Sequence, residues 1–227
     1  MTVSDSATLD SNLLAERLFA ELVDIVRNSV FACPSENWKE GSVFSAEDLE
    51  DVQQSCQGDS EAYRRLVERH QAQVGRILWR FSRDRHVHEE LVQDVFVEAY
   101  LSLRDFQGKA PFAHWLARIA TRVGYRYWKR TARQRKAERF SLEQWDLTAA
   151  QAPEQIDVSH AAELLYRLMA QLPPRDRLVL TLRYLDGCSV AETAQRTGWT
   201  KTMVKVQSLR ARKRLKRLFH RMGIEST

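Results

Sequence analysis

The chain has 227 residues, of which 44% are hydrophobic, and its 35 Lys and Arg against 30 Asp and Glu give a formal net charge of +5. This length and apolar content predict a globular, soluble protein with one or two buried cores, and they exclude a disordered chain. Three cysteines without Cys-x-x-Cys spacing favour neither a disulfide framework nor a zinc site, so we expect a reducing, cytoplasmic setting.

The charge is divided unevenly along the sequence. Residues 1–60 hold 3 Lys and Arg against 12 Asp and Glu, a net charge of −9, which leaves 32 against 18, or +14, for the remainder. Residues 118–139 contain nine Lys and Arg with one acid, and residues 201–221 contain nine with none. This division predicts a nucleic-acid-binding body with two basic surfaces and an acidic appendage.

An all-α fold is predicted, because apolar residues recur at three- and four-residue spacing over long stretches without Gly or Pro. We expect helices over residues 9–32, from 46 after a cap at Ser45, from a cap at Asp59 or Ser60, over 87–103, over 112–135, from 160 to Leu172, over 175–185 and from 190. The segment 140–159 lacks a sustained period and predicts an interdomain linker. The helix over 9–32 is too charged for a membrane span, so we expect no membrane insertion.

The expected cores follow from apolar stripes on these helices. The stripes are Tyr63, Leu66, Val67, Val74, Ile77, Leu78 and Phe81 in the first bundle, and Leu178, Val179, Leu182 and Leu185 near the C-terminus. Phe112, Trp115, Leu116 and Ile119 are also expected in the core.

The segment after residue 188 predicts a helix-turn-helix. Ser189 and Glu192 have the spacing of a capping box, which starts a helix at residue 190. Gly198 then permits the turn, while Ala194 and Val204 supply the small and apolar residues that two steeply crossing helices need. After a cap at Thr200, the second helix presents Lys201, Thr202, Lys205 and Ser208 for phosphates and major-groove base edges. A solvated basic helix is the alternative, but it does not require these coinciding offsets.

Residues 112–130 interleave aromatic rings with cations. Such a helix suits melted nucleic acid, because rings stack on exposed bases while Arg and Lys hold the backbone. The expected contacts are Arg118, Arg122, Tyr125, Arg126, Lys129 and Arg130.

An acidic face interrupts the basic body. Glu90, Gln93, Asp94 and Val97 share one side of the helix over 87–103 by their spacing. This face suits a protein partner, although the pattern alone is also that of a solvated helix surface.

Four segments occur in a characteristic order. They are Glu90-Leu-Val-Gln-Asp-Val-Phe96, Phe112-x-x-Trp-Leu-x-Arg-Ile-Ala120, Leu172-Pro-Pro-Arg-Asp-Arg-Leu-Val-Leu-x-Leu-Arg-Tyr-Leu-Asp-Gly187, and Val204-Lys205 followed by Arg210-Ala-Arg-Lys213. Together they resemble the extracytoplasmic-function (ECF) class of bacterial sigma factors over residues 58–221. The resemblance implies two small helical domains joined by a flexible linker. These are a region 2-like bundle over 58–138 and a region 4-like helix-turn-helix domain over 160–222, with the linker at 139–159, an acidic extension at 1–57 and a tail at 223–227.

The resemblance also implies a factor without catalysis, cofactor, metal or small-molecule substrate, which binds core RNA polymerase and directs promoter recognition in transcription initiation. Polymerase would be bound by Glu90, Gln93, Asp94 and Val97. The melted minus-10 element would be bound by Phe106, Gln107, Gly108, Lys109, Arg118, Arg122, Tyr125, Arg126, Lys129 and Arg130. The minus-35 duplex would be bound by Lys201, Thr202, Lys205, Ser208, Arg210 and Arg212. An anti-sigma factor would be the antagonist, and whether it holds this cytoplasmic protein at the membrane stays open.

Two departures from the family pattern stand out. Arg122 and Arg126 replace the Asn and Asp that relatives commonly have, which should strengthen attraction to the DNA backbone. Val206-Gln207-Ser208 replaces Ser, Arg and an apolar residue, so the minus-35 sequence cannot be transferred from relatives. For the acidic N-terminal extension we expect competition with DNA for the basic surfaces, with packing on a regulator or on the body left open.

Two other functions compete with this interpretation. A free-standing helix-turn-helix regulator would bind duplex DNA without polymerase and would not need the acidic face. A metal or thiol enzyme would use His86, His88 and the cysteines, but no ligand or nucleophile spacing supports it. Both histidines are expected to be solvated.

Overall fold

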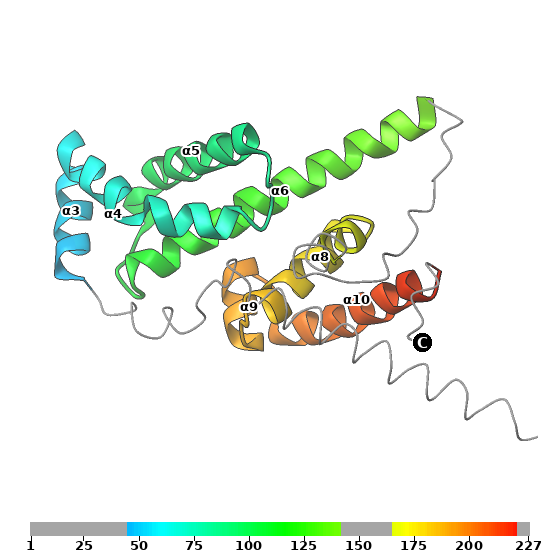
Figure 1. Ribbon diagram of the computed structural model, residues 1–227. Coiled ribbons are helices and arrows are strands. Elements are labelled where there is room, and N and C mark those ends of the chain that lie inside the picture. Colours follow the sequence, from blue (N-terminus) through cyan, green and yellow to red (C-terminus); the bar gives the residue numbers. More distant parts are fainter. Residues whose placement is uncertain (1–44, 142–164, 222–227) are drawn as a thin grey trace, which may run out of the picture. The chain divides into compact units, whose positions relative to one another are not determined.

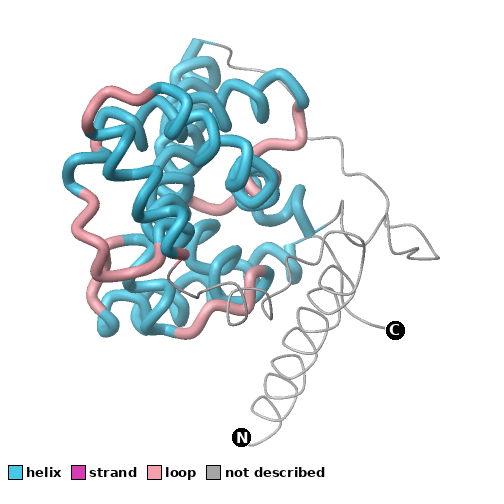
Figure 2. The backbone as a smooth tube through the Cα atoms, turned by 90° about the vertical axis from the view of Figure 1, so that its left-hand side faces the viewer, coloured by secondary structure: helices cyan, strands magenta, loops and turns pink. Residues whose placement is uncertain are grey.

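The computed structural model describes residues 45–141 and 165–221 (Figure 1). Within these ranges the regular structure is entirely helical, and Figure 2 shows only helices and loops. The all-α prediction is therefore confirmed for the described part of the chain. The predicted helix over 9–32, Cys33 and the greater part of the predicted linker lie outside the described residues.

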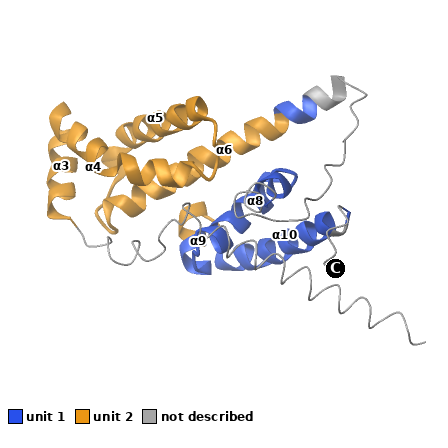
Figure 3. Ribbon diagram, in the orientation of Figure 1, with its two compact units in different colours: residues 1–32, 134–193, 200–227 blue, residues 33–133, 194–199 orange. Residues whose placement is uncertain are grey.

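The helices follow one another with short connections. They are α3 (Ala46–Cys56), α4 (Ser60–Leu78), α5 (Arg85–Leu101), the 3-10 turn η1 (Leu103–Asp105), α6 (Phe112–Ser141), α8 (Pro174–Leu180), the π-helical turn η2 (Thr181–Leu185), α9 (Val190–Thr197) and α10 (Lys201–Arg221). Residues 165–170 are also helical. Two compact units result (Figure 3): unit 2 includes residues 45–133 and 194–199, and unit 1 includes the other described residues.

Polar side chains set where the helices of unit 2 begin. Ser45 accepts a hydrogen bond from the N–H of Asp48 at the start of α3. Asp59 caps α4 by accepting from two backbone N–H groups, and Asp84 caps α5. The caps at Ser45 and Asp59 are as predicted, whereas Asp84 starts α5 two residues before the predicted boundary, because its carboxylate satisfies N–H groups that would otherwise lack partners.

Helix α3 packs against α4 through buried charges. Asp48 accepts from Arg69 at 2.5 Å and lies 3.1 Å from Nε2 of His70. Asp51 pairs with Arg65 at 2.7 Å and with Arg69 at 2.9 Å. A domain boundary at residue 58 would separate this pair, so α3 belongs with the bundle and not with an extension.

Helix α6 lies unusually close to the chain after α4. The Trp128 indole N–H donates to the carbonyl of Phe81 at 2.8 Å, and the two rings lie 4.4 Å apart. Gly124 makes this approach possible, because a Cβ atom there would lie 2.4 Å from the Phe81 ring. Packing of this kind leaves the opposite side of α6 exposed.

The predicted core is largely confirmed. Leu66, Val74, Ile77, Leu78, Phe81, Phe112, Leu116 and Ile119 are buried in unit 2, and Leu178, Val179, Leu182 and Leu185 are buried in unit 1. Tyr63, Val67 and Trp115 are only half-buried. In unit 1, Pro174 opens α8 as predicted, since a proline in the first turn costs no backbone hydrogen bond.

Candidate protein and nucleic-acid interfaces

The acidic face of α5 is exposed. Glu90, Gln93 and Asp94 all face solvent, and Val97 on the same side is 59% exposed. Apolar residues on the other side of the helix, such as Leu91, are buried. The spacing argument therefore placed these four residues correctly on one open surface.

This surface continues into apolar residues that the sequence interpretation missed. Leu101, seven residues after Asp94, is 79% exposed, and Tyr100 is 52% exposed. The signal was available, because residues 94, 97 and 101 have the i, i+3, i+7 spacing of one helix face. Exposed apolar side chains beside carboxylates are typical of protein-binding surfaces.

The loop between α5 and α6 presents polar groups around a glycine. Gly108 has φ of +65°, a left-handed conformation that glycine adopts without strain. Gln107 and Lys109 on either side of it are exposed. Phe106 is half-buried, with its ring 5.4 Å from that of Phe112 in an edge arrangement. The loop therefore offers polar atoms to a ligand, while the Phe106 ring also supports the core.

A basic stripe runs along the exposed side of α6. Its exposed members are Arg118, Arg122, Arg126, Lys129 and Arg130. Tyr125 is half-buried within this stripe, and the Lys129 ammonium lies 5.7 Å from the centre of its ring. The stripe combines cations with an aromatic ring, as binding to single-stranded nucleic acid requires.

One carboxylate of α5 reaches this stripe. Glu98 accepts a hydrogen bond from Arg122 on one oxygen and from Arg126 on the other. Burial raises the pKa of Glu98, but the hydrogen bonds and charges of Arg126 and Arg122 outweigh burial and hold the pKa below its ordinary value. Two of the predicted DNA contacts are therefore already engaged by an anionic side chain.

The helix-turn-helix forms as its local pattern predicted. The Ser189 hydroxyl accepts from the N–H of Glu192 at 3.1 Å, and the Glu192 carboxylate accepts from the N–H of Ser189 at 2.6 Å. Gly198 has φ of +74°, and Thr200 caps α10 by accepting from the N–H of Met203. The capping box, the turn and the second cap are all confirmed.

The predicted contact residues of α10 are exposed with one exception. The exposed ones are Lys201, Thr202, Lys205, Arg210 and Arg212. Ser208 is half-buried, and its hydroxyl donates to the carbonyl of Val204 at 2.8 Å. The correction follows from the phase of the helix, because the buried residues Val204 and Ala211 flank Ser208 and turn it toward the core.

Two apolar side chains occupy the open side of α10 instead. Val206 is 44% exposed and Leu209 is 48% exposed, close to Thr202 and Lys205 by helical spacing. Sequence reasoning had treated Val206 only as a departure from the family pattern. Apolar groups in this position can contact thymine methyl groups in a major groove.

Gln207 has a structural partner. Its amide donates to Asp176 of α8, which is fully buried and also accepts from Arg214. This buried carboxylate joins α8 to α10 and fixes the rotation of α10 about its axis. The Gln207 departure is therefore explained by packing within unit 1.

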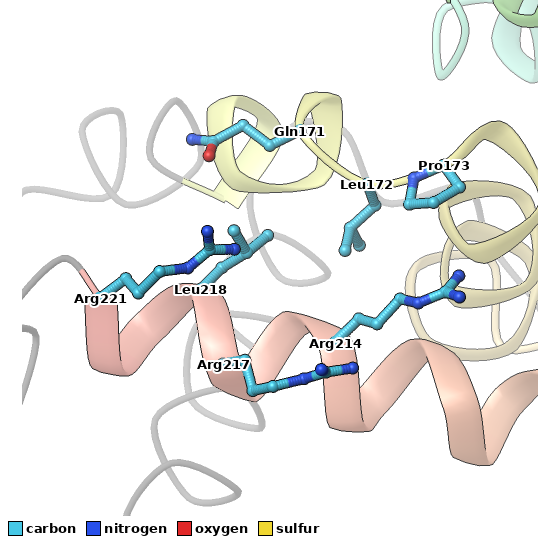
Figure 4. A pocket seen from close by; sticks show the side chains of 7 residues that line it. All are labelled: Gln171, Leu172, Pro173, Arg214, Arg217, Leu218 and Arg221. Atoms are coloured by element: carbon cyan, nitrogen blue, oxygen red, sulfur yellow. The ribbon is translucent and has the colours of Figure 1, made fainter. Parts of the chain in front are cut away.

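A pocket of about 570 Å³ lies in unit 1 (Figure 4). Its lining residues are Gln171, Leu172, Pro173, Arg214, Arg217, Leu218 and Arg221. Three arginines project from one helix beside an apolar floor of leucine and proline. This combination fits an acidic segment that also carries apolar side chains.

Two family models match this chain. Sigma-70 region 2 matches residues 66–134, and Sigma-70, region 4 matches residues 162–215. The ECF RNA polymerase sigma-E factor of Haemophilus influenzae is 31% identical over 161 residues, which are 66% of this chain and 85% of that protein. The chain belongs to the ECF sigma factors. The corresponding sigma-E factor of Escherichia coli K12 is 30% identical over 151 residues, which cover 63% of this chain and 78% of that protein.

Solved structures of other sigma factors are also similar to this one. CnrH, solved in complex with the cytosolic domain of CnrY, is 26% identical with a TM-score of 0.49, over 77% of this chain and 97% of that chain. RpoE of Bartonella quintana, solved with the anti-sigma factor NepR, is 19% identical with a TM-score of 0.47, over 70% of this chain and 96% of that chain.

The family membership assigns the function class. ECF sigma factors are transcription initiation factors, and this sigma factor binds core RNA polymerase and directs promoter recognition. The region 2 match contains α5 and the basic stripe of α6, and the region 4 match contains α9 and the open side of α10.

Other chemistry finds little support in the sigma factor. No group of three His, Cys, Asp or Glu is arranged to bind a metal ion within residues 45–141 and 165–221. His86 is exposed as expected, but His88 is not simply solvated, since its Nε2 donates to the carbonyl of Gly75 at 2.9 Å and its ring packs on Trp79. Cys56 and Cys188 are free thiols. Of the described helices, none combines the length and hydropathy of a membrane span.

Proposed function

We propose that this sigma factor reads a promoter with two helices and docks on polymerase with a third. The stripe on α6 binds the melted minus-10 element, the open side of α10 binds the minus-35 duplex, and the exposed face of α5 binds core polymerase. The observation that carries this proposal is the presence of two exposed cationic helix faces in a chain that matches both sigma regions. The bundle then corresponds to residues 45–138 and the helix-turn-helix domain to 160–222.

The α5 face supports polymerase binding through both its charge and its apolar content. Glu90, Gln93 and Asp94 provide acceptors for basic groups of a partner, and Val97 and Leu101 provide apolar area to bury. A surface that served only for solvation would not keep a leucine 79% exposed.

The α6 stripe and its neighbouring loop support binding of a melted strand. Arg118, Lys129 and Arg130 supply exposed cations for phosphates, and Tyr125 supplies a ring. Gln107 and Lys109 at the loop can address an unstacked base, because single-stranded bases expose their hydrogen-bonding edges.

The α10 face supports binding of a duplex. A helix that follows a tight turn and exposes Lys201, Thr202 and Lys205 at its N-terminal end has the geometry of a major-groove recognition helix. Arg210 and Arg212 lie further along and are placed for phosphates.

Charge reversal on α5 tests the proposal. Glu90→Lys with Asp94→Lys should abolish assembly with core polymerase, whereas Glu61→Lys on α4 changes charge away from this face and should leave assembly intact. Assembly is measured by native gel or size-exclusion chromatography, followed by transcription from a cognate promoter. Unchanged assembly of the double variant, with tight duplex binding by the chain alone, would instead favour the free-standing regulator.

We also propose control by an anti-sigma factor with acidic, apolar segments. The pocket lined by Arg214, Arg217 and Leu218 has the matching chemistry. Such an antagonist would keep the protein in the cytoplasm, or at the membrane if the antagonist is itself anchored there. Purification of the chain from its native cell, followed by identification of the proteins that accompany it, tests for this partner.

The acidic N-terminal segment is proposed to compete with DNA for the basic faces. A truncation that tests this should end at residue 44, because removal of residues 45–57 would also remove α3 and its ion pairs to α4. Equal promoter affinity of the full chain and the truncated chain at every salt concentration would exclude this role.

A further inference from the structure

Glu98 occupies a distinctive position beside the basic stripe of α6. Arg122 and Arg126 are one helical turn apart, and their guanidinium groups converge on its two carboxylate oxygens. The Glu98 side chain is 22% exposed, whereas each arginine side chain is 57% exposed. The carboxylate therefore lies beneath two accessible cations.

The arrangement changes what DNA meets at this part of the stripe. Two guanidinium groups and one carboxylate carry a combined charge of +1 in place of +2. A phosphate that approaches Arg122 or Arg126 is repelled by Glu98, and it must displace the carboxylate or use the guanidinium donors that Glu98 leaves free. The carboxylate stays ionised at neutral pH, because the arginines lower its pKa.

We infer that Glu98 is a specificity-determining residue: it competes with DNA phosphates for Arg122 and Arg126 and so weakens binding of strands that are held through their backbone alone. The inference rests on the proposed role of α6 in binding the melted strand. A cognate strand gains affinity from contacts to its bases, and Glu98 does not reduce these contacts. The ratio of cognate to non-cognate binding is thereby increased.

The test uses the full chain assembled with core polymerase. Two labelled single strands serve as probes, oligo(dT) and a mixed-sequence strand, and their dissociation constants are measured by fluorescence anisotropy across a salt series. Glu98→Gln removes the charge and keeps the size of the side chain. It should bind both strands roughly threefold to tenfold more tightly at low salt. The slope of log affinity against log salt should steepen by about 0.7 if one more phosphate is bound.

Two controls separate this effect from a general change of charge. Glu68→Gln removes a carboxylate that pairs with Arg64 on α4, at a similar exposure, and should leave the affinity and the slope unchanged. In a background of Arg122→Ala with Arg126→Ala, Glu98→Gln should have no effect, because the groups for which it competes are gone.

The outcomes distinguish the inference from the proposed function. Weaker or unchanged binding by Glu98→Gln, or an equal gain in the arginine-free background, would overturn the inference and leave the role of α6 intact. If the Arg122→Ala with Arg126→Ala variant bound both strands as tightly as the unsubstituted protein, the role of these arginines in DNA binding would fall, and the inference with it.

Discussion

Helices α6 and α10 carry the same amount of positive charge but use their acidic partners differently. Residues 118–139 and 201–221 each contain nine Lys and Arg. On α6, Glu98 pairs with two arginines on the exposed side. On α10, Asp176 is buried and pairs with Arg214 and Gln207 toward the core. A count of charges in the sequence therefore does not give the charge that DNA meets.

The comparison indicates two kinds of carboxylate. A carboxylate under exposed arginines modulates a surface and contributes little to stability, because water can replace it. A buried carboxylate that joins two helices stabilises the fold, because its partners lose hydrogen bonds that nothing else supplies. The following predictions test this distinction, from the largest expected effect to the smallest.

Removal of the buried carboxylate should have the largest effect. Asp176→Ala is expected to lower the free energy of unfolding by about 3 kcal/mol, since buried Gln207 loses its acceptor. Glu98→Ala should cost less than about 1 kcal/mol, because Arg122 and Arg126 can be hydrated. Urea unfolding followed by circular dichroism measures both values. Equal losses would remove the distinction between the two acids.

The close approach behind α6 is expected to be next in size. Gly124→Ala should destabilise the bundle by about 1–3 kcal/mol, because its Cβ would lie 2.4 Å from the ring of Phe81, which has little room to shift. Gly75→Ala is the matched control, since its Cβ would lie 3.6 Å from His88, an ordinary contact. Thermal unfolding of both variants decides, and a fully stable Gly124→Ala would show that α6 need not lie so close.

The ion pairs between α3 and α4 predict a pH dependence. Burial raises the pKa of Asp48, but His70 and Arg69 lower it more, so its folded pKa lies below the unfolded one. Its stabilising contribution is therefore complete above the unfolded pKa, about 3.9, and is lost as the pH falls through the folded value.

Asp48→Asn should reduce this acid sensitivity and cost roughly 1–2 kcal/mol at pH 7. Stability measured between neutral and acidic pH tests both statements. Glu50→Gln on the exposed side of α3 is the control and should retain the full pH dependence.

The smallest expected effects concern how α10 binds DNA. Lys205→Gln should weaken binding to any duplex and reduce the salt slope by about 0.9, as the loss of one phosphate contact requires. Leu209→Ser should weaken binding about threefold only at particular base pairs and leave the slope unchanged, since an apolar contact to a thymine methyl releases no counterion. Selection from a random duplex library and titration at several salt concentrations separate the two. A changed slope for Leu209→Ser would contradict its proposed role.

Patterns within a few residues were sufficient for the local structure. The capping box of Ser189 with Glu192, the positive φ of Gly198 and the cap at Thr200 were all predictable from spacing. The same holds for the exposed face at Glu90, because helix geometry alone relates residues three and four apart. Such interactions close within one turn and depend little on the rest of the chain.

Contacts between distant residues could be found only in the tertiary structure. Glu98 meets Arg122 and Arg126, which are 24 and 28 residues away, and the indole of Trp128 reaches a carbonyl 47 residues away. The packing of α8 on α10 likewise decided that Ser208 turns inward and that Leu209 faces solvent. The sequence by itself determined which segments are helices and which of them are cationic. How the helices rotate and pack against one another, which depends on the summed fit of many buried side chains, decided which of those cations remain accessible.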